Sequence, residues 1–249
     1  MRVYVAGPVT VEIGDSVLRE RDLTGQARLV LAMLAVEHRR AVSRDELADE
    51  LWPDRLPRSW DTALRAVISK LRSALVGIGA PPDLIANAFG CYRIRLAPDD
   101  WLDLEAARDA LHAAQIELTR GDARAALGDA RVACLISSRP LLPGVHSPWV
   151  TGRRDRLEVL RVEAHECLAE ALAAVGDFPQ SARVAERAIG LDPYREPLHR
   201  RLIRSHALAG DRAGAARAFA RCRDLLAGEF GIEPTPATVA VYREALELS

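Results

Sequence analysis

Residues 42–75 read VSRDELADELWPDRLPRSWDTALRAVISKLRSAL and predict two helices separated by a loop. Ser43 and Glu46 have the spacing of a capping box, in which each side chain accepts a hydrogen bond from the other residue's backbone N–H. The first helix is expected over residues 44–52, because the ring of Pro53 cannot continue it.

A second helix is expected to begin after Ser59, which can act as its N-cap. Its apolar side chains recur at helical spacing and define a face that packs on the core: Trp60, Leu64, Val67, Ile68, Leu71, Ala74 and Leu75. The opposite face is small and polar with basic edges: Thr62, Ala66, Ser69, Ser73, Arg65, Arg72 and Lys70. Such a slim face suits the major groove of DNA. An ordinary amphipathic surface helix with solvated charges would show the same pattern.

The surrounding segments favour a DNA-binding helix over an ordinary surface helix. Residues 84–87 and 92–96 are expected to form a hairpin, here called the wing, joined across Ala88, Phe89 and Gly90. Alternating apolar residues from Val3 to Val17 predict a small sheet, and residues 26–37 predict a further core helix. A sheet, three helices and a wing together predict a winged helix-turn-helix.

The length of 249 residues favours about two domains, and 49% hydrophobic with 28% charged residues is typical of a folded chain. No apolar run approaches the roughly 20 residues that span a bilayer, and the N-terminus does not resemble a leader, so a cytoplasmic location is expected. The four cysteines form no CxxC pair, which predicts neither a disulfide framework nor a metal site.

The formal net charge is −1, and the charges are balanced along the chain. The part up to residue 99 has 14 basic and 13 acidic side chains, and the remainder has 20 and 22. Strong non-specific affinity for phosphates is therefore not expected, and DNA binding would depend on where individual charges lie. The sequence also lacks the common phosphate-loop, serine-hydrolase and zinc-protease motifs, so no catalytic residues and no cofactor are predicted.

The second part of the chain contains an internal repeat. Gly176-Asp177 recurs 34 residues later as Gly210-Asp211, and Gly121-Asp122 is a third copy. A 34-residue period with small residues at the helix crossings is typical of tetratricopeptide (TPR) repeats. Thr235 and Pro236 predict a last helix with an apolar edge of Val239, Tyr242 and Leu246 that seals the stack.

The first two copies of the Gly-Asp pair are 55 residues apart, which leaves a proline-containing insertion that includes residues 139–149. It could be a loop that binds a partner. It could equally be a structural cover over helix ends, anchored by Trp149. The sequence leaves both alternatives open.

The first 98 residues resemble the OmpR/PhoB type of winged helix, on the motifs Ile68-Ser69-Lys70-Leu71-Arg72 and Gly90-Cys91-Tyr92-Arg93-Ile94. With residues 99–249 included, the chain resembles the SARP family, the antibiotic regulatory proteins of streptomycetes, whose second half is called the bacterial transcriptional activator domain. Further motifs carry this resemblance: Val42-Ser43-Arg44-Asp45, Leu51-Trp52, Trp149 ahead of Leu157-Glu158, and Glu229-Phe230-Gly231-Ile232-Glu233-Pro234.

The resemblance implies a transcription activator that binds direct repeats in promoters and assists RNA polymerase, often at secondary-metabolite gene clusters. One protomer per repeat would make it a homo-oligomer on DNA. The chain departs from the family at residues 23–26, and at Lys70, where arginine is common. The target sequence therefore cannot be inferred. The alternative is a TPR scaffold or ligand-sensing regulator in which DNA binding is secondary.

Seven side chains are the predicted DNA contacts. Four on the second helix are expected at or near bases: Thr62, Arg65, Ser69 and Lys70. Three others are expected at phosphates: Arg58, Arg72 and Arg93.

Overall fold

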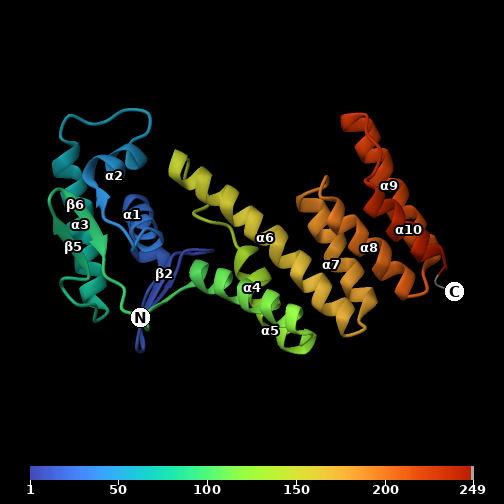
Figure 1. Cartoon of the computed structure of the whole chain (residues 1–249). Helices are drawn as coiled ribbons and strands as arrows, with labels where there is room; N and C mark the ends of the chain where they lie inside the picture. Colours follow the sequence, from blue (N-terminus) through green and yellow to red (C-terminus); the bar gives the residue numbers. More distant parts are fainter. Residues whose placement is uncertain (248–249) are drawn as a thin grey trace. The chain divides into compact units, whose positions relative to one another are not determined.

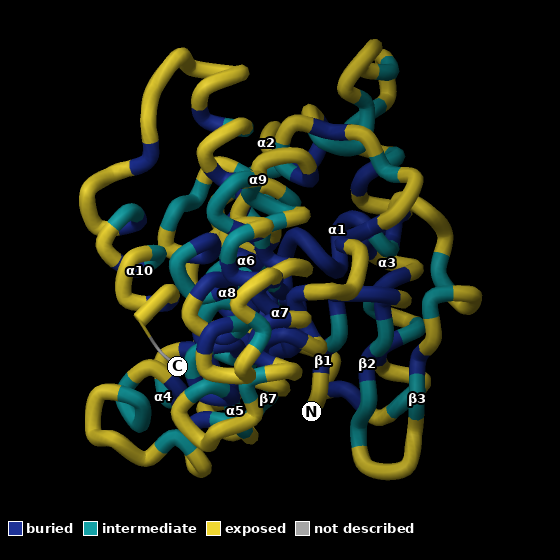
Figure 2. Tube along the Cα trace, turned by 90° about the vertical axis from the view of Figure 1, so that its right-hand side faces the viewer, coloured by how far each residue is buried: buried dark blue, intermediate teal, exposed yellow. Residues whose placement is uncertain are grey.

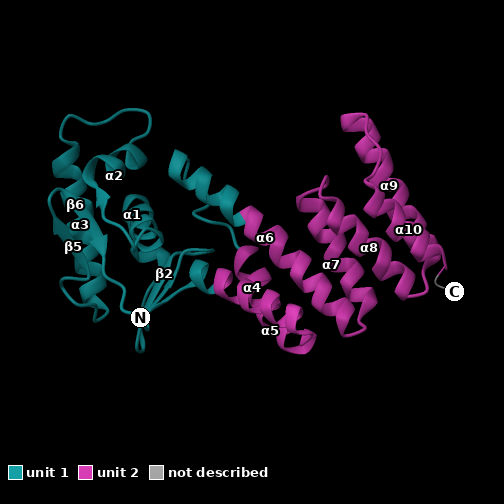
Figure 3. Cartoon of the chain, in the orientation of Figure 1, with its two compact units in different colours: residues 1–106, 139–157 teal, residues 107–138, 158–249 magenta. Residues whose placement is uncertain are grey.

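The structure is a computed structural model that describes residues 1–247 (Figure 1). The chain divides into two compact units, coloured separately in Figure 3. Unit 1 contains residues 1–106 and 139–157, and unit 2 contains residues 107–138 and the chain from residue 158 onward. The chain is mainly helical, and its strands all lie in unit 1 within the described part.

Unit 1 contains two small sheets. The first has the order β3-β2-β1-β7 and is built from β1 (Arg2–Tyr4), β2 (Thr10–Ile13), β3 (Ser16–Leu18) and β7 (Trp101–Leu102). Its pairs are antiparallel except for β1 with β7. The second is antiparallel with the order β4-β6-β5, from β4 (Val42–Ser43), β5 (Ile85–Ala88) and β6 (Cys91–Ile94). The initial sheet and the wing are thus present as predicted.

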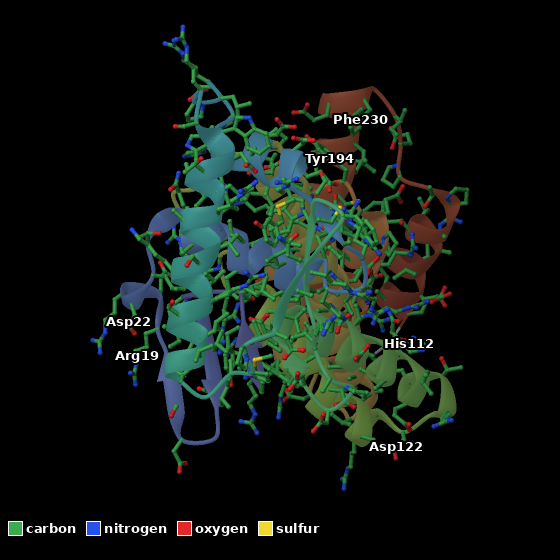
Figure 4. The ribbon with its side chains drawn as sticks, turned by 90° about the vertical axis from the view of Figure 1, so that its left-hand side faces the viewer. Arg19, Asp22, His112, Asp122, Tyr194 and Phe230 are labelled. Atoms are coloured by element: carbon green, nitrogen blue, oxygen red, sulfur yellow. The ribbon has the colours of Figure 1, made fainter. Side chains whose placement is uncertain are left out.

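The core of unit 1 surrounds α1 (Gly25–Val36), which is buried along most of its length (Figure 2). Thr24 caps this helix, because its hydroxyl accepts a hydrogen bond from Ala27 N (3.2 Å). A short 3-10 turn, η1 (Glu20–Asp22), precedes it, and Arg19 N donates to Asp22 Oδ2 at 3.0 Å (Figure 4).

The two helices predicted within residues 42–75 are α2 (Arg44–Leu51) and α3 (Trp60–Gly77). The capping box is confirmed: Ser43 Oγ accepts from Glu46 N (3.0 Å), and Glu46 Oε2 accepts from Ser43 N (2.8 Å). The prediction for Ser59 was wrong in one respect. It occupies the N-cap position of α3, but its side chain makes no capping hydrogen bond.

The tip of the wing also differs from the prediction. Ala88 pairs with Cys91, so only Phe89 and Gly90 form the turn, not three residues. Both have positive φ, 51° and 76°, as a two-residue hairpin loop of type I′ requires. The strand alternation holds, because Tyr92 is buried while Arg93 is exposed.

Unit 2 is built from helix pairs. The helices are α4 (Asp103–Arg120), α5 (Ala123–Ser137), α6 (Pro148–Ala174), α7 (Phe178–Leu191), α8 (Glu196–Leu208), α9 (Arg212–Phe230) and α10 (Pro236–Glu247), of which α4 and α6 begin within the residues of unit 1. The three Gly-Asp pairs end one helix and begin the next. Gly121, Gly176 and Gly210 have φ values of 83°, 85° and 78°.

The aspartates of these pairs all act as N-caps. Asp122 accepts from Ala125 N (3.0 Å), Asp177 from Gln180 N (3.2 Å) and Asp211 from Gly214 N (2.7 Å). The same local geometry at a 34-residue interval confirms the repeat. Small side chains fill the crossings between helices, including the fully buried residues Ala185, Ala188, Ala215 and Ala218.

The last helix begins at Pro236 as predicted, and Tyr242 of the predicted edge packs against the core of unit 2. Thr238, Val241 and Ala245 are buried, whereas Leu246 is 38% exposed and was wrongly placed on the apolar edge. Just before α10, Phe230 lies at the end of α9 and packs edge-on against Tyr194, with ring centroids 4.9 Å apart (Figure 4).

The insertion is part of unit 1. Gly7 N donates to the carbonyl of Pro140 (2.8 Å), and a β-bridge joins Ala6 with Leu141. Leu141 and Leu142 are buried. This packing supports the structural alternative over a free loop. Residues 139–157 thus belong to unit 1, although they were predicted to lie in the second domain.

Cys134, Cys167 and Cys222 are buried free thiols, while Cys91 is partly exposed. Burial raises the pKa of the Cys134 thiol to about 12. Within residues 1–247, no three His, Cys, Asp or Glu side chains are grouped to hold a metal ion, and no helix is both long and apolar enough to cross a bilayer.

Candidate nucleic-acid interface

The α3 helix has one buried and one exposed face. The side chains of Leu64, Val67, Ile68, Leu71 and Leu75 are buried, as the spacing predicts. The predicted contact residues on the other side are exposed: Thr62, Arg65, Ser69 and Lys70. This face is therefore available to a partner, and its outermost atoms are hydroxyls, a guanidinium and an ammonium group.

Asp61, in the first turn of α3, partly neutralises this surface. Its Oδ2 lies 2.6 Å from Arg65 Nη2, and its Oδ1 lies 3.0 Å from Arg44 Nη1. Arg65 is 62% exposed, so its ion pair with Asp61 lies at the surface. The pair orients the guanidinium, but breaking it costs little free energy.

Arg72 differs from the other predicted contacts. Its Nε and Nη2 donate to the carbonyl of Ile85 at 3.1 and 2.7 Å, and its guanidinium lies 5.9 Å from the centre of the Tyr92 ring. Arg72 thus joins α3 to the wing and is only partly exposed. To bind a phosphate, the Arg72 guanidinium would have to divide its N–H donors between the Ile85 carbonyl and the phosphate oxygens.

The remaining predicted phosphate ligands are exposed. Arg93 Nε donates to the carbonyl of His38 (2.9 Å), which holds part of its side chain against the segment that follows α1. Neither Arg58 nor Lys70 forms an ion pair with another residue in the described part of the chain. Both can therefore approach a phosphate or a base without first breaking an internal pair.

Arg44 is a functional candidate that was not among the predicted DNA contacts. Its backbone N–H donates to the carbonyl of Gly90 at the wing tip (3.0 Å), while its guanidinium donates to Asp61 on α3. It therefore connects the two elements that are expected to contact DNA. The only sequence signal was its position in the first turn of α2, beside the residues that pair with the wing.

A buried carboxylate holds the insertion on unit 1. Glu37, just after α1, accepts hydrogen bonds from Trp149 Nε1 (2.8 Å), Arg40 Nε (2.9 Å) and Arg153. Burial raises the pKa of Glu37, but these hydrogen bonds outweigh it and lower the pKa to about 2. The group is therefore ionised at neutral pH and contributes to the position of the α6 N-terminus.

Comparison with known families decides the class of protein. Residues 102–246 match the bacterial transcriptional activator domain, and residues 19–91 match the family described as transcriptional regulatory protein, C terminal. The chain belongs to the SARP family of transcription regulators. The order of the two matches along this SARP chain is the order that the sequence motifs predicted.

Several curated proteins are similar to this SARP chain. The regulatory protein AfsR of Streptomyces coelicolor is 28% identical over 99% of the chain, which covers 24% of AfsR. The transcriptional regulatory protein EmbR of Mycobacterium tuberculosis is 32% identical over 90% of the chain, which covers 58% of EmbR. The regulatory protein DnrI of Streptomyces peucetius is 27% identical over 94% of the chain, and 88% of DnrI is covered. The chain therefore spans only part of the length of AfsR and EmbR.

The fold is also similar to a solved structure. That of Mycobacterium tuberculosis EmbR in complex with a low-affinity phosphopeptide matches with a TM-score of 0.86 and 26% identity. The match covers 99% of this SARP chain and 65% of the EmbR chain.

Proposed function

We propose that this SARP-family regulator is a sequence-specific activator of transcription in which α3 enters the major groove of promoter DNA. One observation carries the proposal: the exposed face of α3 holds hydroxyl and basic side chains while its apolar face is fully used in the core. A helix with this division can lie in a groove about 12 Å wide without losing core packing.

The proposal gives each exposed side chain a role. Arg65 and Lys70 donate to base edges, and the hydroxyls of Thr62 and Ser69 make shorter-range contacts. Arg58, Arg93 and, in part, Arg72 bind phosphates and fix the register of the protein on the duplex. Arg44 acts as a positioning residue, because it touches both the wing and α3.

The distribution of charge supports specific over non-specific binding. The net charge of −1 gives the protein little general attraction to a polyanion. Affinity must then come from a few well-placed contacts, and it should depend strongly on the sequence of the DNA. The regulator is expected to act in the cytoplasm, where promoter DNA is accessible in bacteria.

The contribution of the rest of the chain is also part of the proposal. Residues 1–98 bind DNA, and the TPR-like repeats of residues 99–249 contact RNA polymerase or a neighbouring protomer. Two protomers would lie head to tail on promoter direct repeats of secondary-metabolite genes. Similarity to DnrI and AfsR, both named regulatory proteins, supports a regulatory role of this kind.

The test is a titration of the protein against a promoter fragment and against random DNA of equal length at two salt concentrations. We expect affinity for the promoter fragment at least roughly 1,000-fold above that for random DNA, with a salt dependence that reports several phosphate contacts. Equal affinity for both DNAs would exclude the proposal.

A second candidate, a ligand-sensing regulator, rests on a cavity in unit 2. The cavity has a volume of about 370 Å³ and is lined by Glu186, Ile189, His199, Leu202, Arg221 and Leu225. Its lining combines apolar side chains with the imidazole of His199 and two charged groups, which suits a small amphiphilic molecule. Ligand binding that shifts the melting temperature of wild type but not of Leu202→Trp would support this candidate.

A further inference from the structure

Phe89 at the tip of the wing has two unfavourable properties. Its side chain is fully exposed, with a relative accessibility of 104%. Its φ of 51° lies in the left-handed region, which side chains other than Asn, Asp and Gly rarely adopt. In a two-residue loop of this type Asn-Gly is the preferred pair, so the chain has a large apolar ring where a small polar group would be more stable.

Leu142 shows how such a conformation is normally compensated. It is the other non-glycine residue with positive φ in residues 1–247, at 45°. Its side chain is completely buried, and its carbonyl accepts a hydrogen bond from Arg154 Nη2 (2.5 Å). Phe89 gains no such burial within the described chain. Uncompensated backbone strain of this kind is concentrated at functional sites.

The wing tip is held firmly, although it is exposed. The carbonyl of Gly90 accepts from Arg44 N (3.0 Å), and Arg44 also donates to Asp61 in the first turn of α3 (3.0 Å). Strand β6 pairs with β4 immediately before α2, with Ser43 opposite Cys91. The ring of Phe89 is thus presented at a set position relative to α3.

The surroundings of the ring favour DNA over a protein as its partner. Phe89 lies between Ala88 and Gly90, and no other large apolar side chain of the wing is exposed within residues 1–247. Protein contacts use contiguous apolar patches of several hundred Å². A single ring on a slim hairpin instead fits the minor groove, which is about 6 Å wide and accepts apolar side chains between base steps.

We infer that Phe89 is a minor-groove wedge: its ring inserts beside or between base pairs next to the site that α3 occupies, and unstacks them locally. The inference rests on the proposed function, and it adds a specificity mechanism to it. Base steps that unstack easily would be favoured at this position, although the wing forms no hydrogen bond with their edges.

The test compares wild type with Phe89→Asn and Phe89→Trp on a promoter fragment that carries 2-aminopurine within the protected region, whose fluorescence rises when the base unstacks. Wild type and Phe89→Trp should raise the fluorescence. Phe89→Asn should not, and it should bind roughly tenfold more weakly, as expected for loss of a base–aromatic contact. Because asparagine suits the turn, Phe89→Asn should melt at the same or a higher temperature, which separates the effect from misfolding.

Arg65→Ala serves as the control for the proposed function. If Arg65→Ala lowers affinity while Phe89→Asn changes neither affinity nor fluorescence, the wedge is excluded and DNA binding by α3 stands. If wild type does not distinguish promoter from random DNA, the proposed function fails and the wedge fails with it. If Phe89→Asn affects only cooperative binding to two repeats, Phe89 contacts a neighbouring protomer and the wedge is again excluded.

Discussion

The indole N–H of Trp149 donates a hydrogen bond to the Glu37 carboxylate (2.8 Å), and the two residues are 112 positions apart in the sequence. The guanidinium of Arg153 lies 5.6 Å from the centre of the Trp149 ring and also binds Glu37. The end of α1 and the beginning of α6 are therefore joined through one buried carboxylate. This cluster is one of the contacts that hold residues 139–157 within unit 1.

The first prediction concerns the stability of this cluster. The folded-state pKa of Glu37, about 2, lies below its ordinary value of 4.5, so its stabilising contribution is complete above pH 4.5 and is lost as the pH falls toward 2. Glu37→Gln should lower the free energy of unfolding at pH 7 by about 1 to 3 kcal/mol and should remove this component of the acid dependence. Denaturant titrations at several pH values measure both effects.

Asp103 and the exposed Glu233 provide the controls for Glu37→Gln. Burial raises the pKa of Asp103 to about 6, which lowers stability as the pH rises from about 4 toward 6, and this opposite component should persist in Glu37→Gln. The exposed Glu233→Gln should leave stability unchanged. A Glu37→Gln protein as stable as wild type at pH 7 would show that the cluster is not stabilising.

The second prediction concerns the two basic side chains on the exposed face of α3. Arg65→Ala and Lys70→Ala should each weaken binding to promoter DNA by about 1 to 3 kcal/mol, because each removes a base contact. Arg21→Ala, which removes a surface guanidinium that is 77% exposed, should have a much smaller effect. Fluorescence anisotropy with labelled promoter DNA measures all three. Equal losses for the three variants would indicate a purely electrostatic role.

The third prediction concerns Asp61, whose carboxylate holds Arg65 and Arg44. Asp61→Asn removes a negative charge beside the expected phosphates, so affinity for random DNA should rise and the salt slope should steepen. The ratio of promoter to random affinity should fall, because the orientation of Arg65 is lost. Asp15→Asn makes the same charge change in the turn between β2 and β3 and serves as the control. An unchanged ratio in Asp61→Asn would argue against this positioning role.

The fourth prediction concerns the glycines between helices in the repeats. Gly176→Ala and Gly210→Ala place a side chain at φ values of 85° and 78°, so each should destabilise unit 2 by about 1 kcal/mol or more. Gly190 lies inside α7 and has open space where a Cβ would lie, so Gly190→Ala should be neutral or stabilising. Thermal unfolding of the three variants tests this difference. Destabilisation by Gly190→Ala alone would contradict the assigned turns.

The sequence predicted the exposed face of α3, the start of α2 and the helical repeats, because each depends on residues a few positions apart. The face of α3 could be predicted because Leu64 and Ile68 recur at helical spacing, and the start of α2 because Ser43 and Glu46 interact within one turn. The repeats could be predicted for the same reason, since each aspartate accepts a hydrogen bond from the backbone N–H three residues later, in the first turn of the helix that it caps.

The features that were missed depend on contacts between distant residues or on unusual turn chemistry. Arg72 was expected at phosphates, but its contact with the Ile85 carbonyl arises only when α3 packs on the wing. The two-residue turn was missed because Phe89 does not have the preference for positive φ that asparagine would have signalled. Likewise, no local pattern could show that Trp149 reaches Glu37.

The central claim is that α3 reads bases in the major groove, and selection of binding sites from a random duplex library tests it most directly. Wild type should enrich one motif. Arg65→Ala and Lys70→Ala should each relax the preference at one or two base positions, whereas Arg58→Ala should weaken binding and leave the motif unchanged. The claim would be contradicted if wild type enriched no motif, or if all four proteins selected the same one with the same stringency.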